Sequence, residues 1–317
     1  MKHNNILLTV NILTYNHAQY ITKCIETILS QKTNFDFIIR IFDDCSTDGT
    51  TEICQQYVDK YTDIIELHIT EKNEGPVKNG VRSYTGINTP YYLFIERDDF
   101  LLNKNFIQKA VSTLEMHKDC SFVMGNTINL VNGEYVSPHP CLKTGIYTKL
   151  DFLNNPLKYM FSNLASRVVR TECIKFDNEH PEFYLFDITQ LYELIKQGNM
   201  YFINETFTCY NITNMGVSSG ASLFTKITEN ARIFEQYNRY TEREFETNLA
   251  IYFCQDIFWY YTKEVDKIKS SDGITKDKKI SLKNIKHYLL PPILLDFFNL
   301  PRDISRKIKA LINKENF

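Results

Sequence analysis

The chain has 317 residues, 43 % of them hydrophobic and 14 % aromatic, which is enough for one large α/β domain with an appendage or for two domains. Its formal net charge of -2 excludes a global basic field and argues against a nucleic-acid partner. No apolar run reaches the about 18 residues of a membrane-spanning helix. The N-terminus lacks the apolar core of a signal peptide and the eight cysteines form no CxxC pair, which predicts a cytoplasmic protein with reduced thiols.

Strand-like and helix-like segments alternate through the first third of the chain. Four β-rich apolar runs predict strands at residues 6–13, 37–42, 64–69 and 91–95. Apolar residues at helical spacing follow the first two runs, within residues 21–29 and 53–61. Strands that alternate with helices predict a mostly parallel sheet with helices on both faces.

Each of these strands is followed by a polar loop. In open sheets of this kind, ligands bind beyond the carboxyl ends of the strands. The loops comprise residues 14–16, 43–48, 73–79 and 96–99. We therefore expect these four loops to converge on one edge of the sheet.

The fourth loop is the most informative, because an apolar run ends there in three carboxylates. Glu96, Asp98 and Asp99 lie within four residues, and their charges repel one another. A divalent cation such as Mg²⁺, which takes oxygen ligands and bridges carboxylates to phosphates, would relieve that repulsion. The alternative is a polar turn in which an Asp caps the next helix.

The second half of the chain is less regular. Residues 122–130 and 200–203 predict strands, and the segment between them contains a helix that begins near Asp187 and ends at Gly198. A polar loop is expected at residues 213–222, followed by helix over residues 228–269, a linker at 270–273 and a helical tail. We find no internal repeat.

The four loops together resemble glycosyltransferase family 2, of the bacterial surface-polysaccharide type, which has the GT-A fold. The matching segments are VNILTYN at residues 10–16, DDCSTDGT at 43–50, Asn73-Glu74-Gly75 with Asn79, and Glu96-Arg97-Asp98-Asp99, similar to the family's E-G-D-D variant of the D-x-D motif. The likeness covers residues 6 to about 220. It implies an α/β nucleotide-diphospho-sugar transferase fold with a Rossmann-like, mostly parallel sheet.

The resemblance also implies site residues. Nucleotide contacts would come from residues of all four loops, namely Thr14, Tyr15, Asn16, Asp43, Asp44, Asn73, Gly75, Asn79, Arg97 and Asp98. Asp98, then Asp99, with Glu96 in support, would hold Mg²⁺ or Mn²⁺ on the diphosphate of the donor, by default a UDP-sugar.

Two positions depart from the family pattern. Arg97 stands where the family often has Gly, and its side chain either pairs with a carboxylate or phosphate or points outward. The family's late Y-R-x-H segment reads Tyr210-Asn211-Ile212-Thr213 here, so the Arg and the His near the diphosphate are missing.

Inverting transfer needs a base for the acceptor hydroxyl, and the family places an Asp at a helix start. By resemblance, Asp187 is that base. It is followed by Gln190 and an apolar helical face, a pattern that also describes a plain helix N-cap. The two roles are compatible.

The resemblance divides the chain into a GT-A catalytic domain, residues 1–225, and a helical C-terminal extension, residues 226–317. Residues 1–100 would form the nucleotide-binding half and residues 101–225 the acceptor-binding half. From residue 275 onward ten Lys and Arg face four Asp and Glu, and residues 289–300 form an apolar stretch. We expect peripheral contact with the inner face of the plasma membrane there, a solvated helical face being the alternative. The helical region is also a candidate homodimer surface.

The predicted function is inverting transfer of a sugar to a glycan or lipid-linked glycan. A nucleotidyltransferase is disfavoured, because no Gly-rich signature occurs before residue 40. A non-catalytic nucleotide-sugar-binding module, meaning a degenerate transferase, is the other alternative.

Overall fold

The computed structural model describes residues 5–136, 142–154, 163–175, 179–213, 223–246 and 248–249. The chain divides into two compact units, Met1–Gly216 and Val217–Phe317. The predicted linker at residues 270–273, the basic tail and nearly all of the loop at 213–222 lie outside the described residues. In the second unit the structure describes the helix α9, Leu223–Tyr240. No helix of the described residues is long and apolar enough to cross a membrane.

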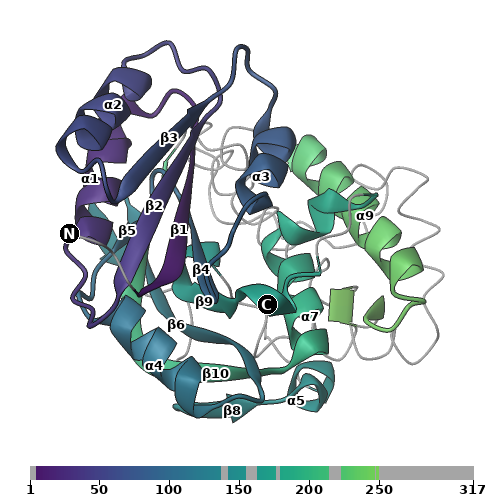
Figure 1. Ribbon diagram of the computed structural model, residues 1–317. Coiled ribbons are helices and arrows are strands. Elements are labelled where there is room, and N and C mark those ends of the chain that lie inside the picture. The colour runs from purple at the N-terminus through teal and green to yellow at the C-terminus, as the bar shows by residue number, and fades with distance from the viewer. Residues whose placement is uncertain are drawn as a thin grey trace, which may run out of the picture. The chain divides into compact units, whose positions relative to one another are not determined.

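The first unit is built on a 10-stranded sheet, whose main path runs β3-β2-β1-β4-β9-β6-β10-β5 (Figure 1). Its first four strands are β1 (Ile6–Thr14), β2 (Asp36–Asp43), β3 (Ile65–Ile69) and β4 (Tyr91–Glu96). They pair in parallel, as predicted. Their carboxyl ends therefore lie at one edge of the sheet.

The second half of the sheet is mixed. β9 (Arg167–Arg170) runs antiparallel to both β4 and β6 (Cys120–Val131), whereas β10 (Asn199–Ile212) runs parallel to β6. Three short strands pair antiparallel at the margins: β5 (Phe100–Leu101) and β8 (Gly145–Tyr147) with β10, and β7 (Glu134–Val136) with β6.

The predicted short strand at residues 200–203 is wrong in length, because β10 continues to Ile212. Register shifts between Ile203 and Thr208 carry the strand past the polar residues that interrupt its apolar pattern. The extension matters for the site, since it brings Tyr210 and Asn211 to the carboxyl edge of the sheet.

Helices cover both faces. One face carries α1 (Ala18–Leu29), α2 (Thr50–Lys60) and α4 (Phe106–Met116), and the other carries α3 (Pro76–Tyr84) and α7 (Asp187–Gln197) (Figure 1). Shorter elements complete the unit: α5 (Lys149–Asn154) and the 3-10 turns η1 (Leu164–Ser166), η2 (Thr171–Cys173) and η3 (Pro181–Tyr184).

The main core lies between the sheet and the α1 and α4 helices. Side chains alternate along each strand, so Val10 and Ile12 of β1 join this core, while Asn11 faces α3 and donates from Nδ2 to the Ser83 carbonyl at 2.7 Å. The same alternation directs Leu93 of β4 into the core and Tyr92 to the opposite face. The face that carries α3 and α7 therefore accommodates polar and aromatic groups.

Candidate active site

The loops after β1 and β2 are tied together at the carboxyl edge. Asn16 has a left-handed backbone (φ 54°), its N–H donates to Ser46 Oγ at 2.9 Å, and its Oδ1 accepts from the Thr47 N–H at 2.8 Å. Asp43 is buried and accepts short hydrogen bonds from the hydroxyls of Ser46 and Thr51. Asn16 and Asp43 thus shape these loops through hydrogen bonds.

Asp44 ties the third loop to the second. Its buried carboxylate accepts from the Glu74 N–H at 2.9 Å, the Gly75 N–H at 2.8 Å and Thr70 Oγ1 at 3.1 Å. Gly75 needs its φ of 89°, a left-handed conformation that favours glycine, and Asn73 Oδ1 also accepts its N–H at 2.9 Å.

Asn79 lies on the buried side of α3. Its Nδ2 donates to the Phe42 carbonyl at 3.0 Å, and its Oδ1 accepts from Arg82 at 2.7 Å. Thr14, at the end of β1, differs from it: its buried Oγ1 has no hydrogen-bond partner among the described residues. A buried polar atom without a partner is costly, which points to a ligand. Tyr15 is 39 % exposed at the same edge.

The two aspartates after β4 differ in how many of their carboxylate oxygens accept a hydrogen bond. Asp99 accepts at Oδ2 from Asn163 Nδ2 at 2.9 Å and at Oδ1 from the Asn211 N–H at 3.1 Å. Asp98 accepts at Oδ2 from Thr213 at 3.2 Å, but its buried Oδ1 has no hydrogen-bond partner in the described part of the chain. Burial, with Glu96 and Asp98 nearby, raises the pKa of Asp99 well above its ordinary value.

A cation is compatible with this loop through Asp98. Its buried Oδ1 accepts no hydrogen bond among the described residues and has only a long ion pair, at 3.8 Å, with Arg97, and a carboxylate oxygen is the kind of hard donor that Mg²⁺ and Mn²⁺ take. Within the ranges that the structure describes, no group of three or more His, Cys, Asp or Glu side chains is arranged to hold a metal ion. Asp98 therefore has one oxygen that accepts no hydrogen bond, whereas both oxygens of Asp99 accept one.

Arg97 points inward, so the pairing alternative is observed and the outward one is wrong. Its side chain is only 12 % exposed, and Nε donates to Nε2 of the buried His17 at 3.0 Å. Weaker ion pairs link it to Glu96 at 3.7 Å and to Asp98 at 3.8 Å. Burial, and then Arg97, lower the pKa of His17, consistent with a neutral ring that accepts this hydrogen bond.

Asp187 is the first residue of α7, and the N-cap position belongs to Phe186, so the plain N-cap alternative is wrong. Burial of the carboxyl raises the pKa of Asp187 to about 6, against the opposing charge of Arg167. Burial also raises the pKa of Glu96, which Arg97 counteracts and Asp98 and Asp187 reinforce. Because 43 % of the Glu96 side chain is exposed, solvent limits that rise.

Tyr210 lies among all four carboxylates. Burial, followed by the charges of Glu96, Asp99, Asp187 and Asp98, raises the pKa of its phenol far above the ordinary value. Residues from the ends of β4 and β10 and the start of α7 thus meet in one place. Sequence reasoning missed Asn163 and Arg167 as parts of the site, since no local motif marks them, and it matched Tyr210 to the Y-R-x-H segment without assigning it a role.

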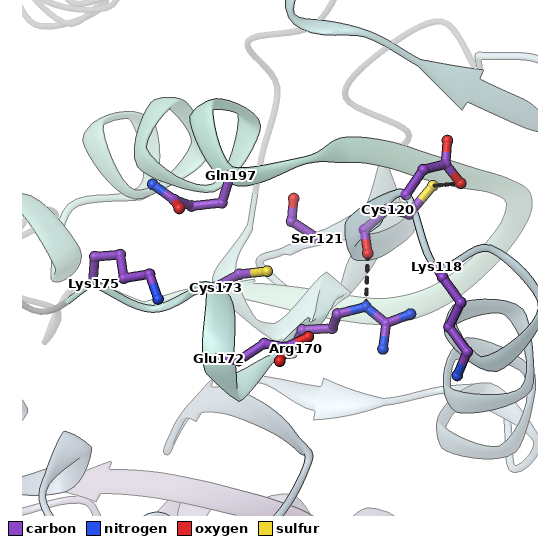
Figure 2. Close-up of a pocket in the computed structure, with 9 residues that line it drawn as sticks. Lys118, Cys120, Ser121, Arg170, Glu172, Cys173, Lys175 and Gln197 are labelled. Carbon is purple, nitrogen blue, oxygen red and sulfur yellow. Dashed lines mark hydrogen bonds between the residues drawn. The ribbon is translucent and has the colours of Figure 1, made fainter.

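A hollow lies at the amino-terminal end of β6 (Figure 2). Its volume is about 270 Å³, and its lining includes Lys118, Cys120 and Arg170. Arg170 Nε donates to the Cys120 carbonyl at 2.9 Å, and Lys118 pairs with Glu115 at 2.6 Å. None of the carboxylates of the candidate site lines this hollow, so the two are separate.

Comparison with known proteins decides the family. The model of the family described as "Glycosyl transferase family 2" matches residues 9–174, more than half of the chain. The chain belongs to glycosyl transferase family 2. The matched residues include the four polar loops, with Glu96, Asp98 and Asp99 in the fourth, and β9. The protein is therefore a glycosyltransferase.

Three of the relatives of this transferase are bacterial proteins. It is 28 % identical over 210 residues to the uncharacterized glycosyltransferase MG025 of Mycoplasma genitalium, covering 61 % of this chain and 70 % of that protein. It is 23 % identical to the processive diacylglycerol beta-glycosyltransferase of the same organism, covering 83 % and 85 %. It is 29 % identical to the poly(ribitol-phosphate) beta-N-acetylglucosaminyltransferase TarS of Staphylococcus aureus over 54 % of this chain, but only 28 % of TarS.

Solved structures show the same fold. TarS residues 1–349, in complex with UDP-GlcNAc, superpose with a TM-score of 0.65 at 19 % identity, covering 95 % of this chain and 83 % of that one. The mannosyltransferase PcManGT of Pyrobaculum calidifontis, in complex with GDP-Man and Mn²⁺, gives 0.55 at 14 % identity, covering 97 % and 88 %. The predicted GT-A fold is confirmed.

Proposed function

We propose that this transferase moves a sugar from a nucleotide diphosphate donor, a UDP-sugar, to a hydroxyl of a glycan or lipid-linked glycan, with inversion at the anomeric carbon. The observation that carries this is the grouping of Asp98, whose buried Oδ1 accepts no hydrogen bond, with Glu96 and Asp187 near enough for the charges of Asp98 and Asp187 to act on the Glu96 carboxyl. The complex of TarS with UDP-GlcNAc supports the choice of donor.

Asp187 is the proposed base. With a pKa of about 6, its carboxylate is ionised at neutral pH and yet more basic than an ordinary Asp. It takes the proton of the acceptor hydroxyl while that oxygen forms the new bond to the anomeric carbon. The bond from the anomeric carbon to the diphosphate oxygen breaks, and the nucleoside diphosphate leaves with the electron pair.

The donor is held by the first three loops and the loop after β4. Thr14, with its unpaired buried hydroxyl, and Tyr15 are proposed at the nucleoside, in loops that Asn16, Asp43, Asp44, Asn73, Gly75 and Asn79 shape and complete. Arg97 is proposed at the diphosphate, where its guanidinium offers donors beyond the one bound to His17.

Asp98, with Glu96 in support, would hold Mg²⁺ or Mn²⁺, and Asp99 would join them only by giving up its hydrogen bonds with Asn163 and Asn211. A bound cation of this kind supplies positive charge that stabilises a departing diphosphate. The presence of Mn²⁺ beside GDP-Man in PcManGT supports this choice.

Two substitutions test the proposal. We expect Asp187→Asn to abolish transfer while leaving UDP binding unchanged, and Asp98→Asn to weaken UDP binding only when Mn²⁺ is present. Asp63→Asn, at an exposed carboxylate in the turn before β3, is the matched control and should change neither. Calorimetric titration of UDP, GDP and dTDP with and without Mn²⁺ reads the binding. No binding of any nucleotide to the folded protein would contradict the proposal.

A non-catalytic binding module is the second candidate, favoured by the absence of the late Arg and His at residues 211 and 213. Such a module would bind UDP but would not convert a UDP-sugar to UDP when acceptor is present. Asp187→Asn would then leave UDP binding unchanged and there would be no turnover for it to reduce. Detection of Asp187-dependent UDP release excludes it.

We further propose that the enzyme works at the inner face of the plasma membrane, through residues 275–317, and that the C-terminal region forms the dimer surface. The likeness to a diacylglycerol glycosyltransferase and the basic composition of this segment support the membrane contact. Deletion of residues 275–317 should release the protein from anionic vesicles. Light scattering of the full chain and of the deletion variant measures the oligomeric state of each. Unchanged partitioning would contradict the membrane contact.

A further inference from the structure

Arg167 is a fully buried cation at the start of β9. It is 1 % exposed, and no carboxylate lies within ion-pair distance of it among the described residues. Burying a guanidinium without such a partner is costly, so its position needs a reason beyond packing. Strand alternation directs it to the α7 face, whereas Arg170 of the same strand faces α4.

The hydrogen bonds of Arg167 are directed to the first turn of α7. Nη2 donates to the Asp187 carbonyl at 2.9 Å, and Nη1 donates to Gln190 Oε1 at 2.8 Å. The positive end of the helix dipole lies at this terminus and disfavours a cation there. The negative charge of the Asp187 carboxylate offsets this unfavourable effect on the Arg167 cation. In turn, Arg167 lowers the pKa of Asp187, against the effect of burial.

Gln190 continues the link into the nucleotide-binding half. Its Nε2 donates to the hydroxyl of Tyr84 at 2.9 Å and to that of Tyr92 at 3.3 Å, and these two hydroxyls are 3.1 Å apart. Tyr84 ends α3, whose first turn follows the loop held by Asp44, and Tyr92 lies in β4, which ends at Glu96. A buried chain of hydrogen bonds thus runs from the turn that carries Asp187 to the two elements that carry the donor loops.

We infer that Arg167 and Gln190 are positioning residues, which hold the start of α7 so that Asp187 faces the donor loops. This rests on the proposed function, in which Asp187 is the base. Neither residue touches the substrate in this scheme. Placement of the base within hydrogen-bond reach of the acceptor is worth a large factor in rate, since a displacement of about 1 Å can cost about 100-fold.

The test compares buried arginines on opposite faces of one strand. Arg167→Met removes the link and its charge, and Arg170→Met is the matched control. Arg170 donates to the carbonyls of Cys120 and Leu114 and has no part in the site. Arg167→Lys keeps the positive charge, but an ammonium group cannot reproduce the two hydrogen bonds that the planar guanidinium donates to the Asp187 carbonyl and Gln190.

For Arg167→Met we expect kcat to fall about 10- to 100-fold, with the donor KM and UDP affinity within about twofold of wild type. The acid limb of the kcat profile should move up by about one pH unit, because the cation that favours ionised Asp187 is gone. Arg167→Lys should return the limb toward wild type while kcat stays reduced. Arg170→Met should leave the limb in place. The other titratable groups near Asp187 are Glu96 and Tyr210, which all variants retain.

Three outcomes are distinguishable. If Asp187→Asn retains turnover, the proposed base is wrong and the inference falls with it. If Asp187→Asn is inactive but Arg167→Met keeps wild-type kcat and acid limb, the inference alone is overturned. Should Arg167→Met fail to fold, as judged by circular dichroism, Arg167→Lys and Gln190→Leu take its place, and a wild-type kcat in both of them overturns the inference.

Discussion

Asp44 carries the sharpest test of how the donor loops are built. Its carboxylate accepts three hydrogen bonds: Oδ1 accepts from the Glu74 N–H at 2.9 Å and Thr70 Oγ1 at 3.1 Å, and Oδ2 accepts from the Gly75 N–H at 2.8 Å. Asp44→Asn keeps the shape but replaces one oxygen by an amide nitrogen. If the amide nitrogen takes the place of Oδ2, it faces the Gly75 N–H, so a donor meets a donor. The bonds from Glu74 and Thr70 then go to a neutral amide oxygen.

The magnitude follows from these bonds. A hydrogen bond to a charged group contributes about 1.5–3 kcal/mol, and a neutral one about half of that. Loss of the Gly75 bond and weakening of the other two would cost about 3–6 kcal/mol in a dry site. Asn73 Oδ1 still accepts the Gly75 N–H at 2.9 Å and Glu74 is exposed to water, so we expect about 2–3 kcal/mol in the free energy of unfolding.

Urea unfolding followed by circular dichroism measures this loss, and calorimetry measures UDP binding. Part of the same free energy must be recovered when UDP orders the loop, so we expect the Kd to rise about tenfold, which corresponds to about 1.4 kcal/mol. Asp63→Asn is the control and should lie within about 0.5 kcal/mol of wild type. If Asp44→Asn also lies within that range and binds UDP normally, the loops are not held by this carboxylate and the reasoning is refuted.

Three further outcomes are expected. The rate of transfer should rise with pH through about 6, as Asp187 loses its proton and becomes able to accept one, and a flat kcat profile from pH 5 to 8 would contradict this. Arg97→Gly, which restores the family residue, should weaken UDP-sugar binding about 10-fold with little effect on UMP, a split that calorimetry with the two ligands reads. Ile25→Ala, at a fully buried position of α1, should cost about 2–5 kcal/mol in urea unfolding and leave UDP affinity unchanged; a loss of affinity would show that the core and the site are coupled.

Local patterns in the chain were sufficient for the first half of the fold. The apolar runs that became β1 to β4 and the helical spacing of Ile21, Ile25 and Ile28 depend on residues that are near each other in sequence. Parallel order then requires the polar loops to share one edge, and β1, β2 and β4 do share it. For the same reason the loops that carry Asp44 and Asp98 could be placed at one edge before any coordinates, whereas Asp187 was named by the resemblance to the family.

Pairing between distant strands decided the rest. The length of β10 and the antiparallel course of β9 depend on pairing with β6 and β4. These partners are tens of residues away in the sequence, so the pattern of nearby residues does not predict the pairing. Those pairings bring Tyr210 among the carboxylates and Asn163 to Asp99, and they bury Arg167 beneath Asp187. The residue types at the site were thus readable from the chain, whereas which aspartate oxygens remain free, and which cation lies under the base, depended on tertiary packing.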